Sequence, residues 1–470
     1  MPVPGPVAVA ELDLRAADGT VLSLRPAPAG PPGGGGEGIA LARTAARPVA
    51  TVTGRVAAGQ EPAEALAAAF RAQHRATPTL PWLPPPAPPP TPPPSSAFFP
   101  PSSPSLAPPP SESDPFSSSP FSSGPSSSGP SSSRLSSSFF PPARSSVRPL
   151  RTTVIVATRE RADRLARALD SLLAQDHPDF RVLVVDNAPA TTATRDLVAS
   201  RYAGRVDYAH EPRPGLAVAH NRGIAVADRA TPVLAFTDDD VIADPHWLSA
   251  LTAPFTADPG LGCTTGLILP ARLTTPAQIL LESHGGFAKG FAPRLYDPAA
   301  PPAGEPLFPF AAGSFGSGAN MAFRAGVLRA VGGFDPATGT GTPAKGGDDL
   351  YAFVRVLAAG HRLRYTPEAL VWHHHRETWQ DLRNQAYGYG AGLTAYLTAI
   401  LVRQPALLPA LLAKVGRGLA HARAITAHGA QTYPWPRSLS RLERRGMLYG
   451  PLGYARARIR ARGAEGGGTP

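Results

Sequence analysis

Three adjacent acidic residues, Asp238, Asp239 and Asp240, follow the apolar run 233–236 after a single Thr237. Adjacent carboxylates repel one another, so a solvated turn gains little from gathering three of them. Carboxylate oxygen is the ligand that Mg²⁺ and Mn²⁺ prefer, and open α/β sheets bind ligands at the carboxyl ends of their strands. The triplet therefore predicts a place where a divalent metal holds a phosphorylated ligand, although an acidic turn or a helix N-cap would also explain it when taken alone.

Two other apolar runs end in polar side chains in the same way. The run 154–156 leads to Thr158 and Glu160, and the run 182–185 leads to Asp186. Each of these groups could belong to a helix cap or a polar loop, but parallel strands end at one edge of a sheet, so we expect them to line one crevice with the acid triplet. The run 154–156 is not followed by a Gly-rich dinucleotide fingerprint, and the chain has no P-loop motif, which argues against both of those nucleotide-binding classes.

The spacing of apolar residues from residue 150 onward predicts strands that alternate with helices. Leu165, Leu169 and Leu172 recur at helical spacing, whereas short continuous apolar runs mark buried strands. This alternation is typical of an α/β fold with a doubly wound, mostly parallel sheet. We expect strands at 154–156, 182–185, 206–209 and 233–236, and helices at 161–175, 191–202 and 215–228.

The 470 residues fall into four parts that differ in their content of Pro, Ser, apolar and basic residues. The Pro/Ser-rich stretch cannot bury enough apolar surface to offset the entropy of ordering it. In the N-terminal part we expect strands at 11–14 and 47–55 and a helix at 61–74. The four parts are a small N-terminal α+β module (1–75), a disordered Pro/Ser-rich linker (76–149), an α/β domain (150–392) and a basic, partly helical C-terminal extension (393–470).

The overall composition limits the cellular compartments and the partners that we expect. A single Cys, Cys263, excludes an internal disulfide and a Cys-based zinc site. The N-terminus lacks the pattern of a signal peptide, and no apolar run reaches the roughly 18–20 residues of a membrane span, so we expect a cytoplasmic protein. The net charge is +11, and beyond residue 383 the only acids are Glu443 and Glu465. We expect no nucleic-acid partner. The apolar and basic tail leaves a peripheral bilayer surface, at the inner face of the plasma membrane, open as a partner.

Several segments, in this order along the chain, resemble a known family. They are VIVATRERADRLARALDSLLAQDHPDFRVLVVDNAP, GLAVAHNRG, TDDD, GGFD and GGDDL. In this order and spacing they are similar to the family 2 glycosyltransferases of GT-A fold, and the resemblance runs from about residue 151 to about residue 392, roughly half of the chain. It implies an inverting enzyme that moves a sugar from a nucleotide-diphosphate donor to an acceptor hydroxyl.

The resemblance also implies places for the sugar donor. Thr158, Glu160 and Asp186 match the segments that hold the nucleoside of the donor. Gly318 and Asn320 lie in the small-residue loop that family members place beside the donor sugar, where a backbone without side chains can approach a ligand closely. An ordinary Gly-rich loop is the alternative reading of that segment.

The acid triplet matches the Asp-x-Asp motif of the family. Asp238 and Asp239 are expected at the donor, and Asp240 is expected to be the direct ligand of Mn²⁺ or Mg²⁺, with Asp238 beside it. His373, in a run of three His residues, matches the family position for a His that contacts the metal or the diphosphate. His375 is a weaker alternative for that ligand.

The pair Asp348 and Asp349 matches the position where the family usually has Gly-Glu-Asp. The family implies Asp349 as the catalytic base, with Asp348 in the place of the usual Glu. Adjacent carboxylates raise the pKa of at least one member, which suits a base that works near neutral pH. A second departure is His220, where the family commonly has an Arg that contacts the donor; either His220 substitutes for it, or Arg213 or Arg222 supplies the charge.

Other classes of function remain open at this stage. A sugar nucleotidyltransferase would use a similar sheet, but it needs a Gly-rich basic loop after the first strand, which this chain lacks. A non-catalytic scaffold on a glycosyltransferase domain should have lost an acid from the triplet or from the pair, and both are intact. The partners that we expect are a nucleotide-sugar donor and a glycan, lipid-linked or small-molecule acceptor.

Overall fold

The computed structural model describes residues 7–14, 21–27, 36–44, 47–57, 60–74, 148–284, 286–414, 416 and 433–466. All of these residues fall within one compact unit. The predicted linker at 76–149 lies outside the described residues except for its last two positions.

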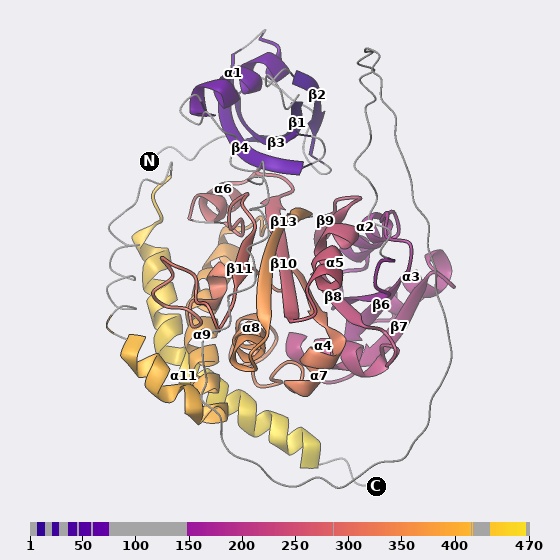
Figure 1. Ribbon diagram of the computed structural model, residues 1–470, viewed down its shortest axis with the longest axis vertical. Helices are drawn as coiled ribbons and strands as arrows, with labels where there is room; N and C mark the ends of the chain where they lie inside the picture. Colours follow the sequence, from indigo (N-terminus) through magenta and orange to yellow (C-terminus); the bar gives the residue numbers. More distant parts are fainter. Residues whose placement is uncertain are drawn as a thin grey trace, which may run out of the picture. The chain divides into compact units, whose positions relative to one another are not determined.

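The main sheet has nine strands, and its first half is parallel (Figure 1). The four strands expected from the sequence are confirmed, and they pair side by side in the order β8-β5-β6-β7. In the other half of the sheet β12 runs antiparallel between β8 and β10, β13 runs parallel to β10, and β9 and β11 lie antiparallel on β13. The strands are β5 (Thr152–Thr158), β6 (Phe180–Asn187), β7 (Val206–Glu211), β8 (Val233–Asp238), β9 (Val241–Ala243), β10 (Leu261–Pro270), β11 (Arg294–Tyr296), β12 (Asn320–Arg324) and β13 (Arg362–His373).

Helices cover both faces of this sheet, which is why its central strands read as continuous apolar runs. Successive residues of β5 point to opposite faces: Val154 and Val156 pack into one core, and Ile155 and Ala157 into the other. The first core is closed by α2 (Ala162–Leu172), α3 (Ala193–Arg201) and α5 (Trp247–Ala257), and the second by α4 (Leu216–Val226), α7 (Ala325–Ala330), α8 (Asp348–Ala358) and α9 (Trp379–Arg403).

The N-terminal module is a four-stranded sheet with one helix. The expected strands at 11–14 and 47–55 and the helix at 61–74 are confirmed, and two strands that the sequence pattern did not indicate complete the sheet in the order β2-β1-β3-β4. Arg43 is buried and donates to Asp244, 2.6 Å away, just after β9. The elements are β1 (Ala8–Leu14), β2 (Val21–Pro26), β3 (Gly36–Thr44), β4 (Arg47–Val56) and α1 (Pro62–His74).

Two long helices, α9 and α11 (Arg437–Gly466), lie side by side in the C-terminal region (Figure 1). The expected boundary at residue 392 falls inside α9, so the helical tail continues directly from the α/β domain. Within the described part of the chain, no one helix has both the length and the apolar composition to cross a bilayer. The segment α9 meets that test only together with 405–414, across a bend of 108°. Shorter helices are α6 (Pro276–Ser283), η1 (Ala312–Ser314) and η2 (Pro405–Leu407).

Glycines on the facing sides of α9 and α11 allow the two helices to touch through their backbones. A Cβ added at Gly446 would overlap the carbonyl oxygen of Tyr387, and one added at Gly450 would overlap the hydroxyl of Thr394 and the carbonyl oxygen of Ala391. The carbonyl oxygens of Tyr387 and Ala391 are backbone atoms of the neighbouring helix, which cannot move aside as the end of a flexible side chain can.

This close packing predicts opposite effects for two Gly→Ala substitutions in α11. We expect Gly446→Ala to lower the free energy of unfolding by about 1–3 kcal/mol, because the added methyl group overpacks the helix contact. Gly463→Ala is the matched control: nothing lies within 4 Å of a Cβ there, so the change should be neutral or stabilising by up to about 1 kcal/mol through helix propensity. Denaturant unfolding of both variants checks this, and equal effects would show that the contact is loose.

Candidate active site

The polar groups predicted at the strand ends do lie at one edge of the sheet. Thr158 is in register with Asp186 on β6, and Ala157 is in register with Asp238 on β8. Asp238 is half-buried, whereas Asp239 and Asp240 are buried just beyond the end of β8. Carboxylates that come from one strand end are thereby held close together in an environment of low dielectric.

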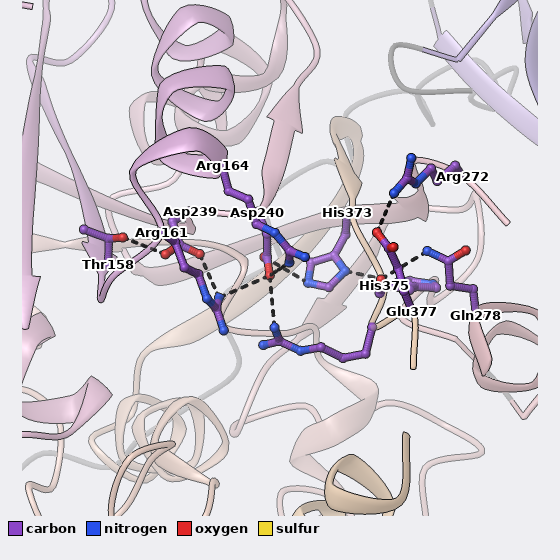
Figure 2. Close-up of polar contacts among 11 residues, drawn as sticks. Thr158, Arg161, Arg164, Asp239, Asp240, Arg272, Gln278, His373, His375 and Glu377 are labelled. Carbon is purple, nitrogen blue, oxygen red and sulfur yellow. Dashed lines mark hydrogen bonds and ion pairs between the residues drawn. The ribbon is translucent and has the colours of Figure 1, made fainter. Parts of the chain in front are cut away.

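Asp238, Asp240 and His373 form a cluster that could hold a metal ion. One ligand atom from each side chain lies within 4.8 Å of the others. His373 ends β13 and pairs in register with Val241 on β9, which follows the acid triplet directly, so its ring faces Asp240 with Nε2 3.3 Å from Oδ1 (Figure 2). These are the three metal ligands expected from the sequence, and the structure brings them together.

Two further side chains fix the orientation of the His373 ring. The Nδ1 atom of His373 lies 3.1 Å from Nδ1 of His375, and Nε2 of His375 lies 2.9 Å from a carboxylate oxygen of Glu282. Because the carboxylate accepts from His375 Nε2–H, His375 Nδ1 is left to accept from His373 Nδ1–H. His373 then presents an unprotonated Nε2 to Asp240. His375 therefore positions the ligand and is not itself one of the three.

The donor set fits a divalent cation on two grounds. Burial lowers the pKa of His373 to about 4, so its ring is neutral at pH 7. A nitrogen lone pair that faces a carboxylate oxygen at 3.3 Å is favourable only when a cation or a proton lies between them. In addition, burial and the neighbouring Asp240 and Asp239 raise the pKa of Asp238 well above its ordinary value, which is the response of crowded acids that lack enough positive charge.

Three arginines surround Asp240, and the sequence reasoning did not single them out. Arg161 and Arg164 place guanidinium nitrogens 3.5 and 3.8 Å from Asp240 Oδ2 (Figure 2). A guanidinium nitrogen of Arg376 lies 3.9 Å from the same oxygen. Arg161 also donates to Asp239 over 3.0 Å, and the Thr158 hydroxyl donates to the other oxygen of Asp239 over 2.7 Å. Both carboxylate oxygens of Asp239 thus accept hydrogen bonds from other residues of the chain. Their positions in the sequence could have indicated this role: Arg161 and Arg164 stand at the start of the helix that follows β5, and Arg376 directly follows the run of three His residues.

Glu160 and Asp186 lie at neighbouring strand ends but have different surroundings. Glu160 is exposed, and its carboxylate accepts from the backbone N–H groups of Ala190 and Thr191 and from the Thr191 hydroxyl, so it ties two loops together. Asp186 is buried and accepts from the Tyr208 hydroxyl over 3.0 Å, and burial raises its pKa. Its Oδ1 atom has no hydrogen-bond partner among the residues that the structure describes.

The expectation that Asn320 holds the donor needs correction. Its side chain is fully buried, and the amide accepts from Trp247 Nε1 and donates to the carbonyl oxygens of Leu267 and Ala369, all within 2.9 Å. Asn320 therefore braces the sheet and has no donor group free for a ligand. Gly318 in the same loop has a direct role: its N–H donates to Asp349 Oδ2 over 2.8 Å.

Asp348 and Asp349 begin helix α8, where free backbone N–H groups favour negative charge. Asp349 accepts from the N–H of Gly318 and the N–H of Leu350, both over 2.8 Å. Burial raises the pKa of Asp349, and those N–H groups and the nearby Lys289 oppose that shift. For Asp348, burial and the neighbouring Asp349 raise the pKa to about 7, although the N–H groups of Asp348 and Asp349 oppose that shift. Lys289 was not singled out in the sequence because it lies in an irregular segment 60 residues earlier.

His220 does not take the place of a donor-contacting Arg. Its ring is fully buried between Phe236 and Phe334, with ring centroids 5.1 and 4.9 Å away, and burial lowers its pKa to about 3. Its Nδ1 atom lies 3.7 Å from Asp348 Oδ2. The two positions at which the chain departs from the family pattern therefore face each other. Arg213, an alternative source of charge, pairs with Glu211 over 3.0 Å.

Comparisons with known proteins show the family of the chain. A family model described as "Glycosyltransferase like family 2" matches residues 149–387, half of the chain. A pre-mycofactocin glycosyltransferase of Mycobacterium tuberculosis is 30% identical over 288 residues, which is 59% of this chain and 55% of that protein. A validoxylamine A glucosyltransferase of Streptomyces hygroscopicus is 35% identical over 133 residues, 27% of this chain and 31% of that protein. The chain spans about half the length, or less, of these curated relatives.

Among solved structures, a mannosyltransferase from Pyrobaculum calidifontis in complex with GDP-Man and Mn²⁺ is similar to this chain with a TM-score of 0.40 and 20% identity. The match covers 67% of this chain and 87% of that one.

The raised pKa of Asp348 makes its ionisation a cost to folding. The pKa in the folded state, about 7, lies above the ordinary 3.8, so the stability contributed by the protonated group is complete below about pH 4 and is lost as pH rises through about 7. Asp348→Asn keeps a neutral group of the same shape. We expect it to raise Tm at about pH 8 by on the order of a few degrees and to change Tm little at about pH 4. The exposed Asp207→Asn serves as the control, and an equal gain at both pH values would contradict the assignment.

Proposed function

The chain belongs to glycosyltransferase family 2, and from this we propose that it is a metal-dependent, inverting enzyme that moves a glycosyl group from a nucleotide-diphosphate sugar to an acceptor hydroxyl. The proposal retains the expected cytoplasmic location, with the inner face of the plasma membrane as the alternative. The acceptor in this proposal is a glycan, a lipid-linked sugar or a small molecule.

One observation carries the proposal: a neutral imidazole and two carboxylates converge within a ring of arginines. Asp238, Asp240 and His373 would hold the ion, with the lone pair of His373 aimed at Asp240. Two hard oxygen donors and one nitrogen suit Mn²⁺ or Mg²⁺. A bound ion would supply electrostatic stabilisation of the negative charge that develops on the leaving diphosphate.

The arginines supply the rest of the positive charge that a diphosphate requires. Arg161, Arg164 and Arg376 are about one-third exposed and lie within 3.9 Å of Asp240. Their side chains can turn from the carboxylates to phosphate oxygens, to which guanidinium groups bind well in pairs of hydrogen bonds. The nucleoside is assigned to the edge formed by Thr158, Glu160 and Asp186. Asp186 Oδ1, which has no partner in the described structure, is the oxygen best placed to accept a hydrogen bond there.

Asp349 is the proposed base. The N–H groups of Gly318 and Leu350 hold its carboxylate in one orientation. It accepts the proton of the acceptor hydroxyl while that oxygen forms the new bond to the anomeric carbon. The bond from the anomeric carbon to the diphosphate oxygen breaks on the opposite face, so configuration inverts. Asp348 carries a proton at neutral pH more readily than an ordinary Asp, so the two adjacent acids need not both be charged.

We predict that nucleoside diphosphate binding requires both a divalent metal and Asp240. Asp240→Ala removes a ligand and should abolish the rise in Tm that UDP or GDP gives with Mn²⁺, just as EDTA should abolish it for the unaltered chain. Asp207→Ala removes an exposed acid elsewhere and should leave the rise intact. Equal rises for Asp240→Ala and the unaltered chain, with and without EDTA, would overturn the metal assignment.

We predict that Asp349→Asn retains donor binding and loses transfer. Removal of a general base lowers kcat by roughly 10²–10⁴-fold, whereas donor affinity measured by the same thermal shift should stay nearly constant. Release of nucleoside diphosphate from a panel of nucleotide sugars, with and without candidate acceptors, measures the transfer. If the variant keeps more than about a tenth of the turnover, Asp349 is not the base, and Asp348→Asn is the next variant to measure.

A further inference from the structure

The outer face of helix α11 exposes a stripe of large apolar side chains. Leu448, Leu452 and Ile459 are 84%, 50% and 71% exposed. Spacings of four and seven residues place the three on one side of the helix. Single exposed apolar residues are common on soluble proteins, but a stripe of three on one helix face is an unpartnered surface.

Arginines occupy the same outer face on both sides of this stripe. None of them forms an ion pair with any acid among the described residues. Glu443, an acid of α11, is partly buried and forms no ion pair with these arginines in the described structure. The exposed arginines are Arg441, Arg444, Arg445, Arg456, Arg460 and Arg462.

Close helix packing fixes which face of α11 points outward. Gly446, Gly450 and Gly453 are buried on the opposite side, where no larger residue would fit against α9 and the loop at Pro343. Rotation of α11 to hide its leucines would drive those backbone contacts apart. The apolar and basic face therefore points away from α9.

The same helix pair is packed against the loop that leads into the acid pair. Gly347, the N-cap of α8, is in the left-handed conformation with φ of 86°, and a Cβ there would meet the backbone of Gly392 in α9. Because α11 packs on α9 and α9 packs on Gly347, a surface that binds α11 would hold the start of α8 at a set distance from itself.

We infer that the outer face of α11 binds the surface of an anionic lipid bilayer. Apolar side chains enter the boundary between headgroups and acyl chains, while arginines beside them pair with anionic headgroups. A nucleic acid would use the arginines but leave the leucines in water. A second copy of this face would bring its arginines against the same arginines. This inference does not depend on the proposed transfer reaction, because binding to vesicles needs neither donor nor metal.

Vesicle co-sedimentation of the full chain tests the inference. Vesicles of phosphatidylcholine with roughly a third phosphatidylglycerol should sediment the protein at about 0.1 M salt, and vesicles of phosphatidylcholine alone should sediment much less. The variant Leu448→Ser/Leu452→Ser/Ile459→Ser should lower the partition to anionic vesicles by at least about tenfold. Leu22→Ser/Leu295→Ser, which alters leucines that are 59% and 45% exposed elsewhere, should bind as the unaltered chain does.

Several outcomes would overturn the inference. One is the absence of sedimentation with anionic vesicles. A second is an unchanged partition for the triple variant whose Tm matches the unaltered chain, because binding would then rest on charge alone. A third is a dimer of the unaltered chain in sedimentation velocity that is absent for the triple variant, because the face would then bind a second copy of the chain. If the triple variant binds heparin as well as the unaltered chain does but loses vesicle binding, the result would support binding to the membrane.

Discussion

The burial of several like charges at one edge of a sheet is the constraint on which the rest of the site depends. Asp238, Asp239, Asp240, Asp348 and Asp349 lie mostly out of water, where isolated carboxylates are costly. The structure compensates the charge of each carboxylate in a different way. Arg161 and a hydroxyl serve Asp239, three arginines serve Asp240, and backbone N–H groups serve Asp349. Asp348 has its pKa raised to about 7, so it holds a proton more readily than an ordinary Asp. Asp238 is the member with the least compensation, which is where a divalent cation contributes most.

The topology of the sheet explains why these answers come from distant parts of the chain. Parallel β5, β6 and β8 deliver their ends to one edge, while β13 pairs with the short strand β9 that follows the acids and so returns His373 to Asp240. The loop before β12 and the N-terminus of α8 meet at Asp349. The acids and His373 are thereby placed at strand ends or at a helix end.

The sequence predicted those parts of the site whose signal is local. Buried runs of Val, Ile and Leu located the four parallel strands, and the acid triplet at the end of one of them predicted Asp238 and Asp240 as metal ligands. His373, at the end of a strand that the sequence did not indicate, was implied by the resemblance to the family. What the sequence did not predict depends on contacts between distant segments. The pairing of Glu282 with His375, 93 residues apart, fixes the tautomer of His373, yet neither residue has a pattern that indicates it. Asn320 stands in a Gly-rich loop as a ligand-binding residue would, and only its pairing with Trp247 shows that it serves the sheet.

His220 and Asp348 show how two departures from a family pattern become one feature in space. Where the family commonly has Arg and Glu, this chain has a His with its pKa near 3 and an Asp with its pKa near 7, with their side chains 3.7 Å apart. Both changes shorten the side chain, and both reduce the charge buried beneath α8 at neutral pH. A neutral pair avoids the desolvation that an Arg–Glu ion pair would require at this depth. It also leaves Asp349, which the N–H groups of Gly318 and Leu350 favour in its ionised form, as the one acid of the pair prepared to accept a proton.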